Sequence, residues 1–166
     1  MAFEENKDLV RRYIEELFRK HDLDVMDEFL SVDYIGHQNL GTGSEERTNG
    51  REDFKEVVKS FFSAFPNSAA TIEDMIEEGD KVVTRWVTRG THEGHYMGVP
   101  PTQKEVIVSG IAIYRIADGK IAESWINGDM MGLMQQIGAF PGKKAFAETF
   151  KPSEEPRMEE VEASPH

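Results

Sequence analysis

The chain has 166 residues, 39% of them hydrophobic, with 31 Asp and Glu against 19 Lys and Arg, which gives a formal net charge of −12. A chain of this length can bury the core of one domain, and its acidity argues against nucleic-acid partners and anionic membrane surfaces. The absence of cysteine excludes disulfides and zinc–thiolate sites, and no apolar run approaches the roughly 20 residues of a membrane span. We therefore expect a cytoplasmic protein with no nucleic-acid or membrane partner.

Three helices are predicted in the first 65 residues. Apolar residues recur at helical spacing over 9–18, 23–30 and 54–65, so each segment presents one apolar stripe, and Pro66 ends the third. Residues 32–37 are predicted to be extended or irregular. The polar, glycine-rich stretch 41–50 is predicted to be a loop.

After Pro66 the pattern changes to the β-branched and alternating type that is typical of strands. Strands are predicted over 70–76, 81–91, 106–116 and 121–127, with turns at 78–80 and 118–119, and a short helix follows over 131–137. Helices that precede an antiparallel sheet indicate an α+β domain in which the helices cover one face of the sheet.

The domain is expected to span residues 1–140. Residues 141–166 are rich in Pro and Glu and poor in large apolar side chains, so we expect an acidic and partly disordered C-terminal extension. The strands leave apolar residues on both faces of the predicted sheet, which predicts a homodimer through the open face.

Asp129 is the main candidate for catalysis. Trp125, Asn127 and Asp129 alternate along the last predicted strand, so their side chains point to one face. A carboxyl group that lies beside an indole and a carboxamide in a water-poor pocket can exchange a proton near neutral pH. The alternative role is structural, because an Asp between a strand and a helix is an ordinary helix N-cap.

Several other residues fit the wall of such a pocket. His37, His92, Tyr34 and Asn127 could donate a hydrogen bond to an enolate oxygen, although each histidine by itself also fits a structural role. Trp86 and Trp125 fit either the core or a pocket wall, and Met131 could pack over a pocket as an adaptable side chain. No metal site is predicted, because His92 and His95 would point to opposite faces of a strand.

Two segments show the pattern of a known family. They are residues 90–102, with the sequence GTHEGHYMGVPPT, and residues 118–138, which contain DGKIAESWINGD and QQIG. Together they resemble the SnoaL-like polyketide cyclases, within the nuclear transport factor 2-like superfamily, over about residues 6–140. The resemblance implies a cone in which three N-terminal helices lie against a strongly curved antiparallel sheet, with a deep pocket between them.

The resemblance also implies a chemistry. In this family an aspartate that matches Asp129 is the acid/base of an intramolecular aldol ring closure, no metal or organic cofactor is needed, and histidines that match His37 and His92 line the pocket. The sequence therefore predicts a cyclase or isomerase for an apolar, carbonyl-bearing small molecule, with Asp129, His92 and His37 as catalytic residues. The predicted substrate contacts are Trp125, Asn127, Tyr34, Trp86, Met97 and Met131.

Two other functions fit the same sequence. The first is a non-catalytic small-molecule binder on the same scaffold. The second is a protein-interaction module that uses a dimerising sheet and the acidic C-terminal extension.

Overall fold

The computed structural model describes residues 2–39 and 46–140, which form four helices and six strands. The helices are α1 (Ala2–Lys20), α2 (Val25–Phe29), α3 (Arg51–Ala64) and α4 (Met130–Gln136). The strands are β1 (Leu30–Asn39), β2 (Glu46–Asn49), β3 (Ala69–Glu78), β4 (Lys81–Thr91), β5 (Glu105–Ala117) and β6 (Lys120–Gly128). The predicted extension over 141–166 lies outside the described residues.

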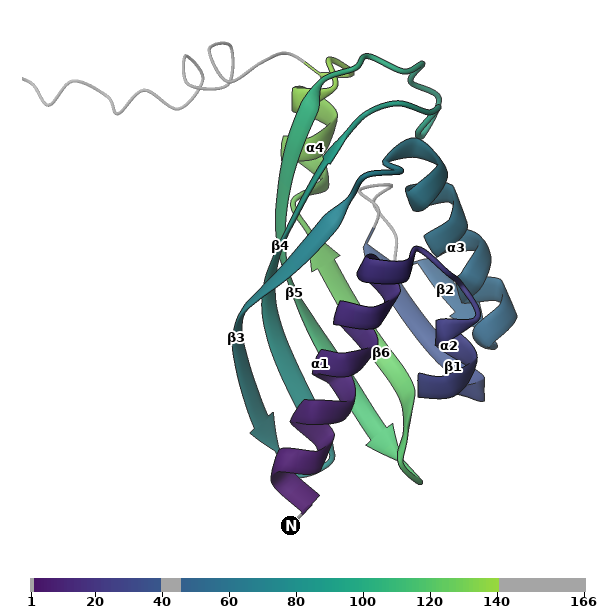
Figure 1. The fold of residues 1–166 in the computed structure, drawn as a ribbon, viewed down its shortest axis with the longest axis vertical. Coiled ribbons are helices and arrows are strands. Elements are labelled where there is room, and N and C mark those ends of the chain that lie inside the picture. Colours follow the sequence, from purple (N-terminus) through teal and green to yellow (C-terminus); the bar gives the residue numbers. More distant parts are fainter. Residues whose placement is uncertain (1, 40–45, 141–166) are drawn as a thin grey trace, which may run out of the picture.

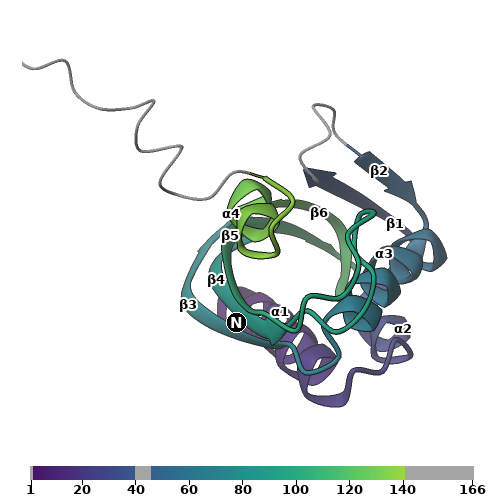
Figure 2. The same ribbon diagram turned by 90° about the horizontal axis from the view of Figure 1, so that it is seen from above.

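The strands form one sheet in the order β2-β1-β6-β5-β4-β3. All neighbouring strands are antiparallel except β1 and β6, which pair in parallel although they lie far apart in the sequence. Long helices α1 and α3 lie on one side of the sheet (Figure 1). Seen from above, the sheet curves strongly, and α1 and α3 lie across its open side (Figure 2). The predicted α+β cone is confirmed.

Two strands lie where the sequence predicted no regular strand: residues 32–37 were expected to be extended or irregular, and 41–50 to be a loop. The stretch 32–37 belongs to β1, and the predicted loop 41–50 contains β2. β1 depends on long-range pairing with β6, in which His37 pairs with Trp125, and β2 pairs with the other edge of β1, where Arg47 is the partner of His37. Because this pairing joins distant segments, the local pattern of residues could not reveal it.

The β5–β6 hairpin closes as its turn sequence predicted. Asp118 and Gly119 both have positive φ, at 50° and 71°, as a two-residue hairpin turn of this sequence requires. The turn, together with a register shift between Arg115 and Ile116, sets the register in which Ile113 pairs with Trp125 and Gly110 pairs with Gly128.

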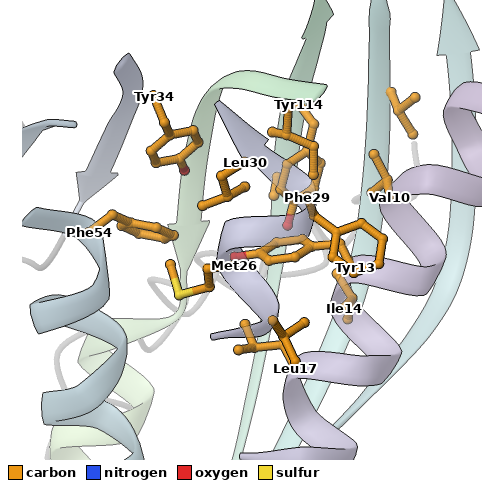
Figure 3. Packing of buried hydrophobic residues seen from close by; sticks show 14 of the residues in the cluster. Val10, Tyr13, Ile14, Leu17, Met26, Phe29, Leu30, Tyr34, Phe54 and Tyr114 are labelled. Atoms are coloured by element: carbon orange, nitrogen blue, oxygen red, sulfur yellow. The ribbon is translucent and has the colours of Figure 1, made fainter. Parts of the chain in front are cut away.

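The buried residues form two clusters. The larger one joins the apolar stripe of α1 to α2, β1, α3 and β5, and its labelled members converge between these elements (Figure 3): Val10, Tyr13, Ile14, Leu17, Met26, Phe29, Leu30, Tyr34, Phe54 and Tyr114. The smaller one lies beneath α4 and contains Phe65, Tyr96, Val106, Val108, Leu133 and Ile137. Within the described residues, no helix is both long and apolar enough to span a membrane.

Candidate functional site

A cavity of about 360 Å³ lies between the helices and the inner face of the sheet, a volume that suits a small organic molecule. Its lining draws on both core clusters, with Tyr13 and Tyr114 from the larger one and Tyr96 and Leu133 from the smaller one. The lining contains no Asp, Glu, Lys, Arg or His among the described residues, so its polar groups are uncharged. The cavity therefore suits a neutral, mostly apolar ligand.

One wall of the cavity is the indole of Trp86. A Cβ atom added at Gly110 would lie 2.3 Å from Trp86 Cζ2, and one added at Gly128 would lie 3.3 Å from Trp86 Cη2. Gly110 and Gly128 are partners in the β5–β6 ladder. The indole of a β4 residue can therefore lie across β5 and β6 because both neighbouring strands have a glycine at that level.

A second wall is formed by the end of β1. Buried and less buried residues alternate along this strand, and Tyr34, Gly36 and Gln38 face inward. Gln38 is only 4% exposed and lines the cavity. Neither Nε2 nor Oε1 of Gln38 has a hydrogen-bond partner within the described part of the chain.

Three tyrosine side chains of the lining are neutral hydroxyl groups at physiological pH. Burial raises the pKa of Tyr114 and of Tyr96 to about 12, and burial together with the nearby phenols of Tyr34 and Tyr114 raises the pKa of Tyr13 well above its ordinary value. These tyrosines can donate hydrogen bonds to a ligand, but they are not poised to act as bases.

Asp129 lies at the rim of the cavity and is exposed. Its carboxylate is the N-cap of α4 and accepts a hydrogen bond of 2.8 Å from the N–H of Gly132, so the structural role considered for it is present. Its chain neighbours Gly128 and Met130 line the cavity, whereas Asp129 itself does not. The burial expected for this carboxyl group is not found.

Trp125, Asn127 and Asp129 follow the predicted alternation, but the cavity lies on the other face of β6. In this segment the lining residues are Ile126 and Gly128, which fall between them in the sequence, and Met130, which follows Asp129. Asn127 is exposed, and Trp125 is not part of the lining. Alternation groups Trp125 with Asn127 within β6, but it could not tell which face of the strand is turned inward.

His37 and Trp125 meet on the outer face of the sheet. Their rings stack with centroids 5.2 Å apart and an interplanar angle of 5°. Nε2 of His37 lies 2.8 Å from Oε1 of Glu123, whose other oxygen accepts a hydrogen bond of 2.9 Å from Nε of Arg115. Burial would raise the pKa of Glu123, but the hydrogen bonds and charges of His37 and Arg115 outweigh it and lower that pKa below its ordinary value.

His92 is fully buried behind the cavity rather than in its lining. Its ring centroid is 5.4 Å from that of Phe65, and its Nδ1 lies 3.0 Å from Oγ1 of Thr102. Burial lowers the pKa of His92 and so favours the neutral imidazole. The three predicted catalytic residues therefore do not come together around the cavity in this structure.

Of the predicted substrate contacts, Trp86 and Met97 line the cavity. Tyr34 is buried beneath it, where its hydroxyl bonds to Oγ of Ser124, and Met131 is exposed on α4. Sequence reasoning missed Gln38. The signal was present, because Tyr34 and Gln38 share a strand face while His37 points to the opposite one.

Comparison with known proteins identifies the family. The family model of the SnoaL-like polyketide cyclases matches residues 8–137, so the chain belongs to this family. The nogalonic acid methyl ester cyclase of Streptomyces nogalater is 31% identical over 116 residues, which cover 69% of this chain and 84% of that protein. The aklanonic acid methyl ester cyclase DnrD of Streptomyces peucetius is 32% identical over 132 residues, covering 79% and 89% respectively.

Solved structures agree with this assignment. A protein assigned to the SnoaL-like polyketide cyclases from Jannaschia sp. CCS1 superposes with a TM-score of 0.76 at 26% identity, covering 84% of this chain and 95% of that one. IdmH of Streptomyces antibioticus, described as a polyketide cyclase, gives a TM-score of 0.68 at 32% identity, covering 80% and 98%. The predicted family is confirmed, and the chain is an enzyme of the cyclase and isomerase kind.

Proposed function

We propose that the protein closes a ring by an aldol-type reaction, or carries out a related isomerisation, on a neutral carbonyl-bearing substrate held in the cavity. The observation that supports this most is the lining, which is mostly apolar and has no ionisable side chain other than tyrosine among the described residues. Two relatives are named as cyclases of methyl esters, in which an acid group is masked as a neutral ester. A cavity without a cation suits such a substrate better than a free carboxylate.

In this proposal Asp129 is the general acid/base. Its carboxylate takes a proton from the carbon next to a carbonyl group, the resulting enolate attacks a second carbonyl of the same molecule, and the proton returns to the new alkoxide. One carbon–carbon bond forms, the proton is conserved, and no cofactor is required. The buried phenols of the lining supply neutral donors for the enolate oxygen.

Asp129 must leave its N-cap position to serve in this way. Loss of an N-cap interaction typically costs about 1 kcal/mol, which is small beside the ~10²–10⁴-fold contribution of a positioned acid/base. The residue lies between Gly128 and Met130, both of which line the cavity, so a side-chain rotation at the rim could bring the carboxylate toward the substrate. Catalytic roles for His37 and His92 stay predictions, and both lie outside the lining.

The test distinguishes the helix-capping role of Asp129 from its proposed role as the acid/base. Asn and Ser are good N-cap residues but cannot act as carboxylic acids, so Asp129→Asn and Asp129→Ser should keep the melting temperature and lower turnover by ~10²–10⁴-fold. The substrates to assay are nogalonic acid methyl ester and aklanonic acid methyl ester, with products resolved by liquid chromatography. Asp118→Asn is the matched control, because Asp118 is exposed in the β5–β6 turn and Asn tolerates its positive φ. Full turnover by Asp129→Asn would rule out the acid/base role.

A second candidate function is non-catalytic binding of the same kind of ligand. The exposure of Asp129 and its cap hydrogen bond favour this alternative. Wild-type protein that binds both methyl esters but converts neither would support it, whereas turnover by the wild type would exclude it.

We also propose that the protein is a homodimer through the outer face of the sheet. Ile107 and Ile111 of β5 are 54% and 52% exposed on that face. Sedimentation should show a dimer at micromolar concentration and a monomer for Ile111→Lys. Val32→Lys is the control, because Val32 is 75% exposed on β1. A wild-type monomer would contradict the proposal.

A further inference from the structure

We propose that Gln136 is a positioning residue for the reaction: its carboxamide fixes α4 on β5 and thereby holds Asp129 at the rim of the cavity. This inference rests on the proposed function, because it takes Asp129 as the group that moves the proton. It assigns a role to a glutamine that lies outside the cavity lining and that belongs neither to the predicted catalytic set nor to the predicted substrate contacts.

The first argument is the way in which the carboxamide of Gln136 binds β5. Its Oε1 accepts from the N–H of Ile107 at 2.8 Å, and its Nε2 donates to the carbonyl oxygen of the same residue at 2.9 Å. A side chain that bonds both backbone groups of one strand residue imitates a neighbouring antiparallel strand. Within the described part of the chain, β6 offers β5 no partner at this level, because their ladder ends where Gly110 pairs with Gly128. Gln136 therefore extends the pairing along an edge that β6 leaves open.

The second argument is that hydrogen bonds lead from this carboxamide to the carboxylate of Asp129. Nε2 of Gln136 also donates to the carbonyl oxygen of Gly132 at 3.0 Å, and the N–H of Gly132 donates to Oδ1 of Asp129 at 2.8 Å. The three residues are spaced by three and four positions, so they share one face of α4. Through Gly132, the backbone of β5 is thus connected to the capping carboxylate.

Gly132 also provides the space in which the carboxylate lies. A Cβ atom at this position would lie 2.2 Å from Oδ2 and 2.7 Å from Cγ of Asp129. Glycine in a helix is less stable than alanine, so its presence in the first turn of α4 is explained by the room that it leaves rather than by helix formation.

The third argument is that α4 needs an anchor. The helix has only seven residues, and a helix this short is not stable through its own backbone hydrogen bonds. It lies beside β5 in both views (Figure 1 and Figure 2). Its start is tied to β5 by a hydrogen bond of 2.9 Å from the N–H of Asp129 to the carbonyl oxygen of Ser109. Its last residue, Gln136, binds Ile107, two positions away on the same strand, so the two ties together fix the helix on β5.

The position of α4 matters for the reaction because the carboxylate caps this helix and the helix forms part of the cavity wall. Met130 and Leu133 of α4 line the cavity, and Asp129 directly precedes Met130. A shift of the helix by about 1 Å would move the carboxylate relative to a bound substrate, and a misplacement of that size can lower a rate by about 10²-fold. Gln136 therefore acts on the reaction through the placement of Asp129.

The test is a double-mutant cycle between Gln136 and Asp129, with nogalonic acid methyl ester and aklanonic acid methyl ester as substrates. Gln136→Met keeps the length of the side chain and removes its three hydrogen bonds, so kcat should fall by about 10–10²-fold. In the Asp129→Asn background the same substitution should change kcat by less than about twofold, because no acid/base is left to misplace. An equal fall in both backgrounds would show that Gln136 acts independently of Asp129, and it would overturn the inference while leaving the proposed function intact.

The matched control is Gln135→Met. Gln135 is the neighbouring half-buried glutamine of α4 and takes no part in the three hydrogen bonds, so this variant should keep the kcat of the wild type. A fall in kcat equal to that of Gln136→Met would overturn the inference, because any methionine at the end of α4 would then have the same effect.

A second measurement tests the anchor without a substrate. Exchange of the Gly132 amide proton with solvent, followed by nuclear magnetic resonance, should become about fivefold faster in Gln136→Met, as the loss of one net hydrogen bond would give, and should not change in Gln135→Met. Unchanged exchange in Gln136→Met would overturn the inference.

Two outcomes lie outside this cycle. If Gln136→Met does not fold, Gln136→Glu takes its place, because it keeps the acceptor for the N–H of Ile107 and loses only the donors, and the dependence of its kcat effect on Asp129 then decides in the same way. A wild type that converts neither ester, or full turnover by Asp129→Asn, would overturn the proposed function and the inference with it.

Discussion

Alanine at Gly110 should destabilise the protein and displace Trp86 toward the cavity. The added Cβ would lie 2.3 Å from Cζ2 and 2.8 Å from Cε2 of Trp86, whereas carbon atoms in contact lie about 3.5–4.0 Å apart. The same Cβ would lie 2.5 Å from the backbone carbonyl oxygen of Asn127. The indole must therefore retreat by more than about 1 Å, and the β5–β6 ladder must also shift.

The expected cost follows from these contacts. Overpacking a filled core typically costs 1–3 kcal/mol, and we expect about 2–3 kcal/mol for Gly110→Ala because one of the opposing atoms belongs to the backbone. Gly128→Ala is the comparison with a smaller clash, since the nearest atom to its Cβ would be Cη2 of Trp86, at 3.3 Å, and the other neighbours would lie at ordinary contact distance. The far edge of the ring can give way by a few tenths of an ångström, so we expect less than about 1 kcal/mol there.

Urea denaturation measures both variants, with the shift of the midpoint at constant slope giving the change in the free energy of unfolding. The effect of Gly110→Ala should fall by about half when Trp86 is replaced by Leu, because the ring contacts are then gone and the carbonyl contact remains. Equal costs for Gly110→Ala and Gly128→Ala, or a cost of Gly110→Ala that does not depend on Trp86, would refute this account of the wall.

Three further outcomes are expected. Gly132→Ala would place a Cβ 2.2 Å from Oδ2 of Asp129 and displace the N-cap carboxylate. The lost cap costs about 1 kcal/mol and the better helix propensity of alanine contributes about 1 kcal/mol, so the two effects offset each other and the melting temperature should change little. Because burial lowers the pKa of His92, the imidazole binds a proton more readily in the unfolded chain than in the folded one, and the free energy of unfolding should fall as the pH drops below about 6.5. His92→Phe should make the free energy of unfolding, measured by urea denaturation, less dependent on pH between 7 and 5. An unchanged pH dependence in this variant would contradict the prediction. Because the net shift lowers the pKa of Glu123, its contribution is present above the ordinary glutamate value and is lost as the pH falls through the lowered one. Glu123→Gln should therefore destabilise the protein at pH 7, by an amount that shrinks as the pH falls below the ordinary glutamate value, and a loss that does not change with pH would count against the His37 and Arg115 contacts.

The local pattern of the sequence was enough for much of the fold. The apolar stripes predicted α1 and α3, and alternation predicted β4 over Lys81–Thr91 and the β5–β6 hairpin with its turn at Asp118 and Gly119. These elements are set by contacts between neighbours in the chain, which repeat with a period of 3.6 or 2 residues. The family pattern in the second half of the chain is equally a property of the sequence.

The cavity was decided by the tertiary structure. β1 becomes a strand by pairing with β6 and β2, and this pairing brings Gln38 to the cavity. Likewise, Trp86 forms a wall because Gly110 and Gly128, on two other strands, lie at the same level of the sheet. Neither arrangement is visible in a window of neighbouring residues.

The same holds for the face of β6. Alternation divides its end into two sets, Trp125 with Asn127 and Asp129, and Ile126 with Gly128 and Met130, and both sets mix polar or small residues with large apolar ones. A period of two fixes which side chains share a face but not which face is covered by helices. The packing of α1 and α3 determines which face of the sheet is covered. Ile126 therefore lies in the cavity wall, and the carboxylate of Asp129 lies at the rim.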